Sequence, residues 1–66
     1  MKATVNGEEL ELPDGASVGD VLRGIGAPDS GIAVARDGEV VPRAAWDTTP
    51  VREGDGIEVL TAVQGG

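Results

Sequence analysis

The chain has 66 residues, 12 of them acidic and five basic, and a formal net charge of −7 at pH 7. A chain of this length buries only about 60% of the surface that it exposes when unfolded, so we expect one small domain with a single core. Clustered lysine and arginine bind nucleic acids and anionic membranes; here the basic residues are few and scattered, so neither is an expected partner. The absence of cysteine and histidine excludes disulfides, thiolate nucleophiles, histidine bases and the usual zinc sites.

No apolar run approaches the roughly 20 residues that cross a bilayer as a helix. The start of the chain, Met1–Val5, also lacks the apolar core of a secretory signal peptide. We therefore expect a cytoplasmic protein. A small acidic chain without a set of catalytic side chains is predicted to bind something, or to be acted on by other enzymes, and not to be an enzyme itself.

The first predicted element is a β-hairpin that covers residues 2–12. Apolar and polar residues alternate in Ala3–Val5 and again in Leu10–Leu12, which is the two-residue period of half-buried strands. Asn6-Gly7 lies between them and suits the positive backbone angles of a type I′ turn. Pro13 then ends the second strand, because proline lacks the amide that strand pairing needs.

One short helix is predicted to follow. Ser17 is a good N-cap, and Asp20 lies three residues later, near the unpaired amides at the positive end of the helix dipole. Gly26 and Pro28 end the helix after roughly two turns. Four apolar residues at helical spacing share one face, which we expect to pack on a sheet: Val18, Val21, Leu22 and Ile25.

Three strands are predicted in the rest of the chain. Ile32–Ala35 is a continuous apolar run, typical of a strand that is covered on one face and crowded on the other. Asp37-Gly38 forms a second tight turn into Glu39–Val41. The last strand is predicted over Ile57–Val63, after a turn at Glu53–Gly56.

Residues 43–50, between the last two strands, show no clean period, and we interpret them as an irregular connection with room for a single helical turn. Trp46 lies in this connection and is the only aromatic residue of the chain. It is predicted to cover the end of a core built otherwise from aliphatic side chains, because a lone tryptophan more often fills a gap than forms an exposed recognition site.

The predicted order, strand, strand, helix, strand, strand, strand, suits few topologies in a domain this small. The first and last strands fit the centre of the sheet, and pairing them in parallel needs a long crossover that contains the helix. This arrangement is an α+β domain with the β-grasp, or ubiquitin-like, fold: a mixed sheet of about five strands packed on one short helix. A small open barrel is the alternative, but such barrels seldom use a buried helix as half of the core.

Several polar residues are interpreted as surface and not as sites. Glu9 and Glu11 are expected on the outward face of a strand, and nothing fixes a second carboxylate opposite them. The acidic residues near the first hairpin are therefore interpreted as a solvated face: Glu8, Glu9, Glu11 and Asp14. Glu53–Gly56 is similar to a calcium loop in composition only, because it lacks ligands at every second position and a distant bidentate glutamate. Ser17 and Ser30 have no base to activate them. We therefore predict no metal site and no catalytic residue.

The end of the sequence offers the most specific chemistry. We expect a single domain over residues 1–63, followed by a flexible tail, Gln64-Gly65-Gly66. Glycines without Cβ atoms can extend into a narrow channel and approach a nucleotide closely. The α-carboxylate of Gly66, ionised at neutral pH, can attack the α-phosphate of ATP and form an acyl-adenylate that is open to a sulfur or nitrogen nucleophile.

Over essentially its whole length the chain resembles the sulfur carrier proteins of thiamine biosynthesis, the ThiS family. The residues that carry the resemblance are Asn6-Gly7, Val41-Pro42-Arg43, Trp46, Glu53-Gly54-Asp55 and, most specifically, Ile57–Gly66. Three glycines depart from the family pattern: Gly19 and Gly24 make the helix unusually glycine-rich, and Gly56 stands where a larger polar residue is expected.

The resemblance implies a function for Gly66. An E1-like adenylyltransferase of the ThiF type would adenylate its carboxylate with ATP, and sulfur from a cysteine desulfurase would convert it to a thiocarboxylate. That sulfur would then pass to a thiazole synthase of the ThiG type. The carrier itself would bind no cofactor.

The last strand also suggests how partners are contacted. Gln64 and Gly65 are predicted to thread into partner enzymes. Leu60 and Ala62 lie on the opposite strand face from residues 57 and 59. If the helix covers the face of residues 57 and 59, Leu60 and Ala62 form an apolar patch for a partner.

Three other functions stay open. The small subunit of molybdopterin synthase is a carrier of the same type, although the short chain and the run Thr61–Gln64 favour the thiamine branch. A ubiquitin-like modifier would share the first steps but would join substrate lysines through an amide bond. A plain interaction domain, in which the two terminal glycines are accidental, is the last alternative.

Overall fold

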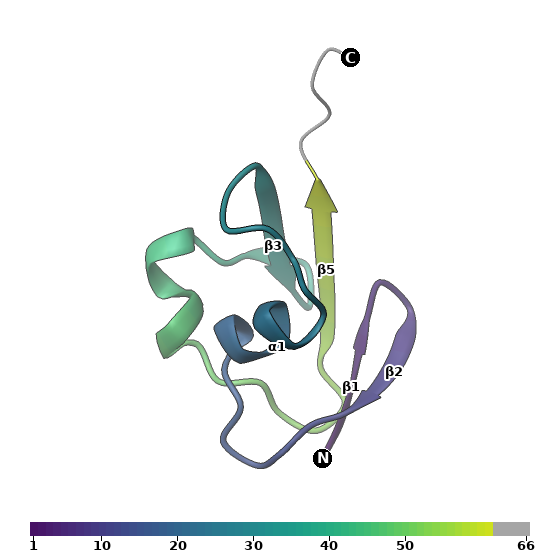
Figure 1. Cartoon of the computed structure of the whole chain (residues 1–66). Coiled ribbons are helices and arrows are strands. Elements are labelled where there is room, and N and C mark those ends of the chain that lie inside the picture. Colours follow the sequence, from purple (N-terminus) through teal and green to yellow (C-terminus); the bar gives the residue numbers. More distant parts are fainter. Residues whose placement is uncertain (62–66) are drawn as a thin grey trace.

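The computed structural model describes residues 1–61 and shows the predicted order of strands around one α-helix (Figure 1). The elements are β1 (Lys2–Val5), β2 (Glu8–Glu11), α1 (Val18–Gly24), β3 (Ile32–Arg36), β4 (Glu39–Val40), the 3-10 helix η1 (Arg43–Thr48) and β5 (Gly56–Thr61). Within this part of the chain the strands form one five-stranded sheet in the order β2-β1-β5-β3-β4. β1 and β5 run parallel and every other neighbouring pair is antiparallel. The predicted mixed β-grasp sheet, with its first and last strands side by side, is confirmed.

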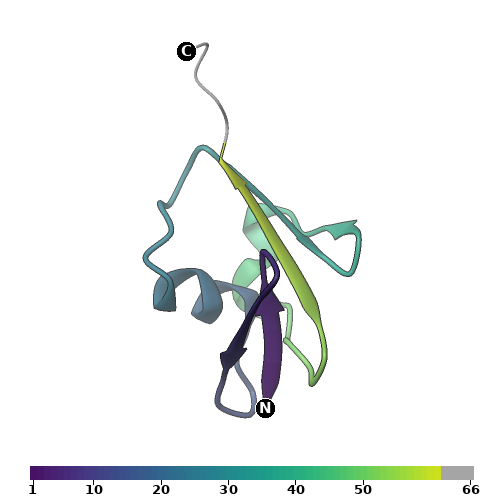
Figure 2. The ribbon, with the colours of Figure 1, turned by 90° about the vertical axis from the view of Figure 1, so that its right-hand side faces the viewer.

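The helix α1 lies on one side of the sheet (Figures 1 and 2). Side chains of the helix and the sheet pack together in one hydrophobic core. The core is aliphatic, as the composition predicts, and joins side chains from α1, from the three inner strands and from the segment before β5. Its buried members are Ala3, Val5, Val18, Val21, Leu22, Val34, Val51 and Ile57. Trp46 packs against this cluster half-buried, and its Nε1 donates a hydrogen bond to the carbonyl of Val41 at 2.9 Å. The predicted covering role of the indole is therefore confirmed.

Both predicted tight turns have the backbone conformation of type I′ turns. Asn6 and Gly7 have φ values of 51° and 85°, and Asp37 and Gly38 have φ values of 51° and 86°. Positive φ at both central residues matches the right-handed twist of the flanking strands, and asparagine or aspartate followed by glycine adopts it most readily. The two hairpins therefore follow from local sequence.

A capping box starts α1, as Ser17 and Asp20 predict. The Ser17 hydroxyl accepts a hydrogen bond from the Asp20 amide at 3.1 Å, and the Asp20 carboxylate accepts one from the Ser17 amide at 3.0 Å. Arg23 donates to the same carboxylate at 2.9 Å. The hydrogen bond from the Ser17 amide, assisted by the one from Arg23, lowers the pKa of Asp20 below its ordinary value.

The prediction for Ile25 is wrong. Val18, Val21 and Leu22 are buried as expected, but Ile25 keeps 42% of its surface exposed. The helix ends at Gly24, so Ile25 is its C-cap, and Gly26 then turns the chain away with a φ of 75°. A seven-residue helix covers the sheet for less than two full turns, and the fourth apolar position falls beyond the core.

The two helix glycines differ in their surroundings. A Cβ atom built on Gly19 would collide with the carboxylate of Asp47, whereas one built on Gly24 would meet nothing within 4 Å. Gly19 thus lies against the Asp47 side chain of η1, and the same Asp47 carboxylate lies 3.1 Å from the Arg23 guanidinium. Because Asp47 is exposed and its side chain can move, this contact does not require glycine at position 19, and nothing in the structure explains Gly24.

Smaller differences from the prediction concern element bounds. Residues 43–48 form a 3-10 helix where we expected an irregular connection with a single helical turn. β5 begins at Gly56, one residue earlier than predicted. Ala33 is exposed, so β3 is covered on one face but is not crowded on the other.

We expect Leu22→Ala to lower the free energy of unfolding by about 2–5 kcal/mol, because it leaves a cavity between α1 and the sheet. Ile25→Ala removes a side chain of similar size from a largely exposed site and should cost less than half as much. Chemical denaturation of the two variants measures the difference. Equal unfolding midpoints for Leu22→Ala and the wild type would place Leu22 outside the core.

The Asp20 carboxylate should make stability depend on pH in a defined direction. Its pKa is lowered in the folded state, so its contribution is present above the unfolded value, about 3.8, and is lost as the pH falls below it. We therefore expect Asp20→Asn to be less stable than the wild type at pH 7, and the difference to shrink in acid. Urea unfolding between neutral pH and strong acid tests this, with Asp29→Asn as an equal charge change in an exposed loop. A difference that grows in acid would contradict the capping argument.

Candidate functional site

The residues predicted to carry function lie at the end of β5 and beyond it. Ala62, Gln64, Gly65 and Gly66 lie outside the described residues, and so does the predicted boundary between a domain of residues 1–63 and a tail of residues 64–66. Leu60 is the one predicted site residue that the structure places. The described part of the site consists of β5 and the elements that hold it.

β5 pairs with a neighbouring strand on both edges, but the two pairings differ in length. β3 pairs with it in antiparallel fashion over five of its six residues, from Arg36 opposite Ile57 to Ile32 opposite Thr61. The parallel pairing with β1 is short and stops where Val5 lies opposite Ile57. β5 thus continues past the end of β1 and past the turn that follows it (Figure 1).

Two side chains from the type I′ turns extend the hold on β5. The Asn6 carboxamide faces Val59: its Oδ1 accepts from the Val59 amide at 2.9 Å and its Nδ2 donates to the Val59 carbonyl at 3.2 Å. At the other end of the strand, Asp37 Oδ1 accepts from the Gly56 amide at 2.8 Å. Sequence reasoning missed both contacts, because the turn dipeptides predict a backbone conformation and not a distant partner.

The two faces of β5 have different neighbours. Ile57 is 1% exposed and Val59 is half-buried on the face that packs toward α1, whereas Leu60 on the opposite face is 66% exposed. This confirms the predicted orientation of the strand, although contact of Leu60 with a partner stays a prediction.

Other small apolar side chains share the open face with Leu60. The strand register places Ala33 opposite Leu60, and Ala35 opposite Val40, which is 76% exposed. We call these four residues, Ala33, Ala35, Val40 and Leu60, the outer patch. A contiguous exposed apolar patch can mark a surface that another protein covers.

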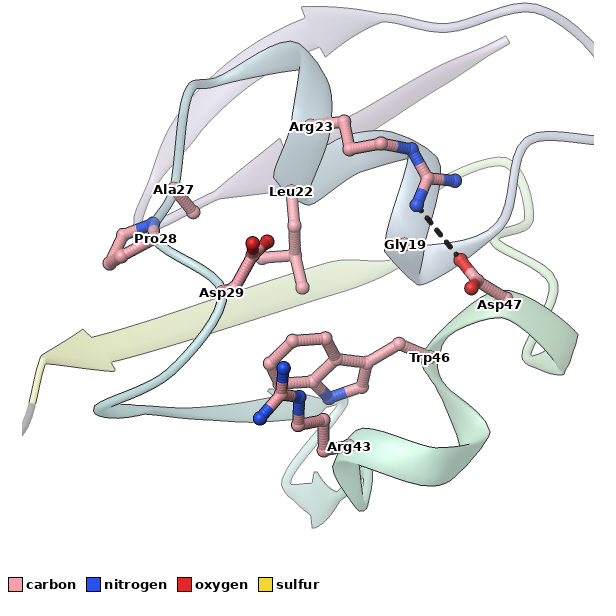
Figure 3. Close-up of a pocket in the computed structure, with 9 residues that line it drawn as sticks. All are labelled: Gly19, Leu22, Arg23, Ala27, Pro28, Asp29, Arg43, Trp46 and Asp47. Atoms are coloured by element: carbon pink, nitrogen blue, oxygen red, sulfur yellow. Dashed lines mark ion pairs between the residues drawn. The ribbon is translucent and has the colours of Figure 1, made fainter.

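A second candidate surface is the groove between α1 and η1 (Figure 3). Figure 3 shows the Trp46 indole at its floor beside the Arg43 guanidinium, with the Arg23–Asp47 ion pair at one end. The side chains that line the groove include no serine, threonine or lysine, so it contains no nucleophile with an adjacent base. The groove offers a surface for contact but no machinery for covalent chemistry.

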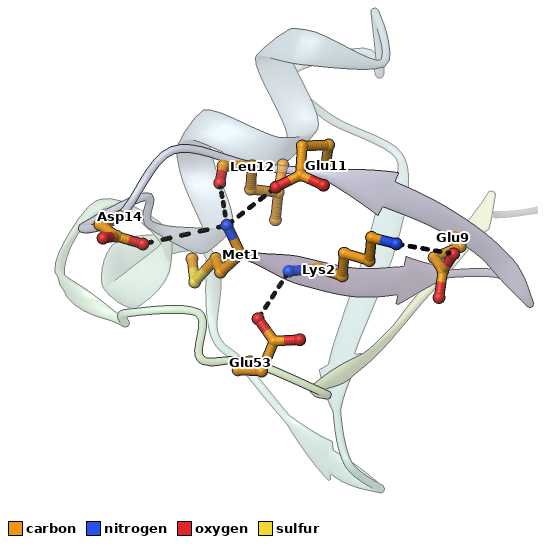
Figure 4. Close-up of polar contacts among 7 residues, drawn as sticks. All are labelled: Met1, Lys2, Glu9, Glu11, Leu12, Asp14 and Glu53. Carbon is orange, nitrogen blue, oxygen red and sulfur yellow. Dashed lines mark hydrogen bonds and ion pairs between the residues drawn. The ribbon is translucent and has the colours of Figure 1, made fainter.

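The acidic residues near the first hairpin are on the surface, as predicted, and some form ion pairs (Figure 4). The Met1 ammonium lies 3.0 Å from Glu11 and 3.9 Å from Asp14, and Lys2 Nζ lies 3.9 Å from Glu9. The hydrogen bond to Glu11 raises the pKa of the Met1 ammonium above its ordinary value. Among residues 1–61 no group of three or more acidic side chains is arranged to hold a metal ion.

The described part of the chain also contains no helix with the length and apolar character that crossing a membrane requires.

A mixed sheet with parallel first and last strands at its centre and one helix across a face defines a ubiquitin-like β-grasp protein. The chain belongs to the ThiS family, whose model matches residues 1–66. It is similar to the crystal structure of a thiamine biosynthesis protein (ThiS) from Geobacter metallireducens, with 32% identity, complete coverage of both chains and a TM-score of 0.84. A solution structure of a thiamine biosynthesis protein from the same organism gives 33% identity and a TM-score of 0.79, and covers all of this chain and 88% of that one.

A curated relative is much longer than this chain. A thiazole synthase of Paramagnetospirillum magneticum is 32% identical over 66 residues, which are all of this chain but only 20% of that protein. The chain therefore spans about a fifth of the length of the curated relative that it matches.

Proposed function

We propose that this chain is a sulfur carrier of thiamine biosynthesis, which other enzymes act on and which catalyses no reaction itself. The observation that carries the proposal is the position of β5. This strand lies at the centre of a ThiS-family β-grasp sheet and leads into the segment that ends in Gly65-Gly66. The family match favours this function over a molybdopterin-synthase subunit and over a plain interaction domain.

The proposed chemistry takes place on the α-carboxylate of Gly66. One carboxylate oxygen attacks the α-phosphorus of ATP, the bond to the bridging oxygen breaks, and pyrophosphate leaves. The product is an acyl-adenylate, in which AMP is a good leaving group. The terminal sulfur of a persulfide, formed with sulfur from a cysteine desulfurase, then attacks the acyl carbon and displaces AMP, which leaves an acyl disulfide. A second thiol attacks the outer sulfur of this disulfide, so that the thiocarboxylate is released and a new disulfide forms between the two thiols. An E1-like enzyme would bind the ATP, and this chain would contribute only the carboxylate and the surface that presents it.

Thiazole synthase is the proposed acceptor of the sulfur. In the Paramagnetospirillum relative, a region similar to this whole chain forms one fifth of a protein named thiazole synthase. Joining the two in one protein raises the effective concentration of a donor near its acceptor. This arrangement in the relative supports a direct contact between the carrier and a thiazole synthase. We also propose that the protein acts in the cytoplasm, as expected from the sequence.

The outer patch is the proposed docking surface for the activating enzyme. Val40 and Leu60 are exposed on the face away from α1, and Leu60 lies close in sequence to Gly66. A partner that covers this patch would therefore also be placed to receive the end of the chain. The outer patch would supply the apolar contact area, and Gly65 and Gly66 would extend into the partner.

Deleting Gly66 should abolish adenylation while leaving the unfolding transition nearly unchanged, because the residue lies beyond every buried side chain of the described core. In Gly65→Val the carboxylate is retained, but a β-branched side chain restricts the backbone and adds bulk in a narrow channel. We expect pyrophosphate release by the cognate activating enzyme to fall at least about tenfold, or about 1.4 kcal/mol.

Two outcomes would count against this proposal. Normal sulfur transfer by the protein that lacks Gly66 would exclude the carrier function, and near-normal turnover of Gly65→Val would exclude the narrow channel. Intact mass of the protein from cells that make thiamine should show the replacement of one oxygen by sulfur, and fragmentation should map it to Gly66. Protein adducts that survive thiol reductants would instead indicate a ubiquitin-like modifier.

Leu60→Glu should weaken docking without unfolding the protein, because the side chain is 66% exposed. We expect kcat/KM for adenylation to fall at least about tenfold, as when a central interface residue is lost. Ile25→Glu is the matched control: it makes the same charge change at a residue that is 42% exposed and lies at the end of α1, outside the outer patch. Equal effects of the two changes would exclude the outer patch as the docking surface.

A further inference from the structure

On the β1 side of β5, the hydrogen bonds change at Val59 from backbone partners to a side-chain partner. Up to Ile57 the β1 side of the strand is bonded by backbone: the Thr4 amide donates to the Asp55 carbonyl and the Asn6 amide donates to the Ile57 carbonyl, both at 2.9 Å. At Val59 the backbone of β1 has already turned away into the hairpin. The Asn6 side chain takes its place and bonds both the amide and the carbonyl of Val59.

A carboxamide has the same donor and acceptor as a peptide group, so Asn6 acts here as one further peptide unit of β1. This geometry depends on the turn. The φ of 51° at Asn6 bends the main chain back toward β2 while its side chain stays directed at β5. The two bonds join residues that are 53 positions apart in the sequence, at the last inward-facing position before Thr61 ends the described strand.

We infer that Asn6 is a positioning residue: its carboxamide fixes the direction of the described end of β5, from which the chain continues to Gly66, before a partner binds. The inference rests on the proposed carrier function. We call the two hydrogen bonds between Asn6 and Val59 the clamp. Without it, only β3 would hold the strand beyond Ile57, and the end of the strand would have to become ordered during docking. Ordering on binding weakens apparent affinity, whereas the chemistry after the tail has entered the channel is unaffected.

The second type I′ turn provides a matched control. Asp37 has the same φ as Asn6, also precedes a glycine, and also bonds the backbone of β5, but at Gly56, at the opposite end of the strand. Asn6→Gly and Asp37→Gly each remove one exposed side chain, and each leaves a Gly-Gly turn that still adopts the I′ conformation. Both changes should therefore have similar effects on stability, and only the change at Asn6 should alter the end that leads to the tail.

Amide hydrogen exchange tests the clamp without any partner enzyme. Asn6→Gly should increase exchange at Val59 and leave Gly56 unchanged, whereas Asp37→Gly should do the reverse. Asn6→Asp keeps the acceptor for the Val59 amide but places an oxygen against the Val59 carbonyl, so its Val59 exchange should lie between those of the wild type and Asn6→Gly. Unchanged Val59 exchange in Asn6→Gly would overturn the inference.

Adenylation kinetics with the cognate activating enzyme and ATP test the positioning role. For Asn6→Gly we expect KM for the carrier to rise about fivefold, the scale of ordering one further residue, with kcat nearly unchanged. Asp37→Gly, measured in moderate salt to screen the charge difference, should keep both constants near the wild-type values. Equal KM values for the two variants, or a fall in kcat alone, would contradict a positioning role for Asn6. Absence of pyrophosphate release with the wild type would instead contradict the proposed function, and the exchange pattern would still report on the clamp.

Discussion

The parallel pairing of β1 with β5 is the constraint on which the rest of the structure depends. Val5 and Ile57 lie opposite each other in this pair and are both buried. Two parallel neighbours from opposite ends of a chain require a crossover, and here the crossover contains α1, whose apolar face covers the pair. The core is therefore small and central, and its stability rests on a few aliphatic contacts across the helix and the two middle strands.

The short register of this pair leaves Val59 without a backbone partner on the β1 edge of β5. Only two residue pairs of β1 and β5 lie in parallel register. Asn6 therefore bonds Val59 on this edge, whereas Asp37 bonds Gly56 on the other edge, where it extends the pairing with β3. The Glu53 carboxylate similarly accepts from the Lys2 amide at 2.8 Å and ties the entry into β5 to the start of β1 (Figure 4).

The two faces of β5 also differ, because one contributes to the core and the other is open to solvent. Its inner face supplies Ile57 to the core, and its outer face carries the exposed Leu60. On the proposed function, the same strand anchors the fold and presents the reacting end of the chain. Such a protein needs no catalytic side chain of its own, because the carboxylate that reacts is part of the backbone and the machinery for activating it belongs to the partner.

Local chemistry in the sequence determined the elements: the two Xaa-Gly turns, the capping box of Ser17 and Asp20, and the alternation that turns Ile57 inward and Leu60 outward. It also led to the β-grasp order and to the family, and it singled out Gly66, which lies beyond the described residues. Only the tertiary structure decided how these parts meet. The exposure of Ile25 depends on where α1 ends relative to the sheet, and the contact of Gly19 with Asp47 depends on how closely η1 approaches. The bonds from Asn6 to Val59 join residues 53 positions apart, so no local pattern encodes them, and they exist because the sheet brings the first turn beside the last strand.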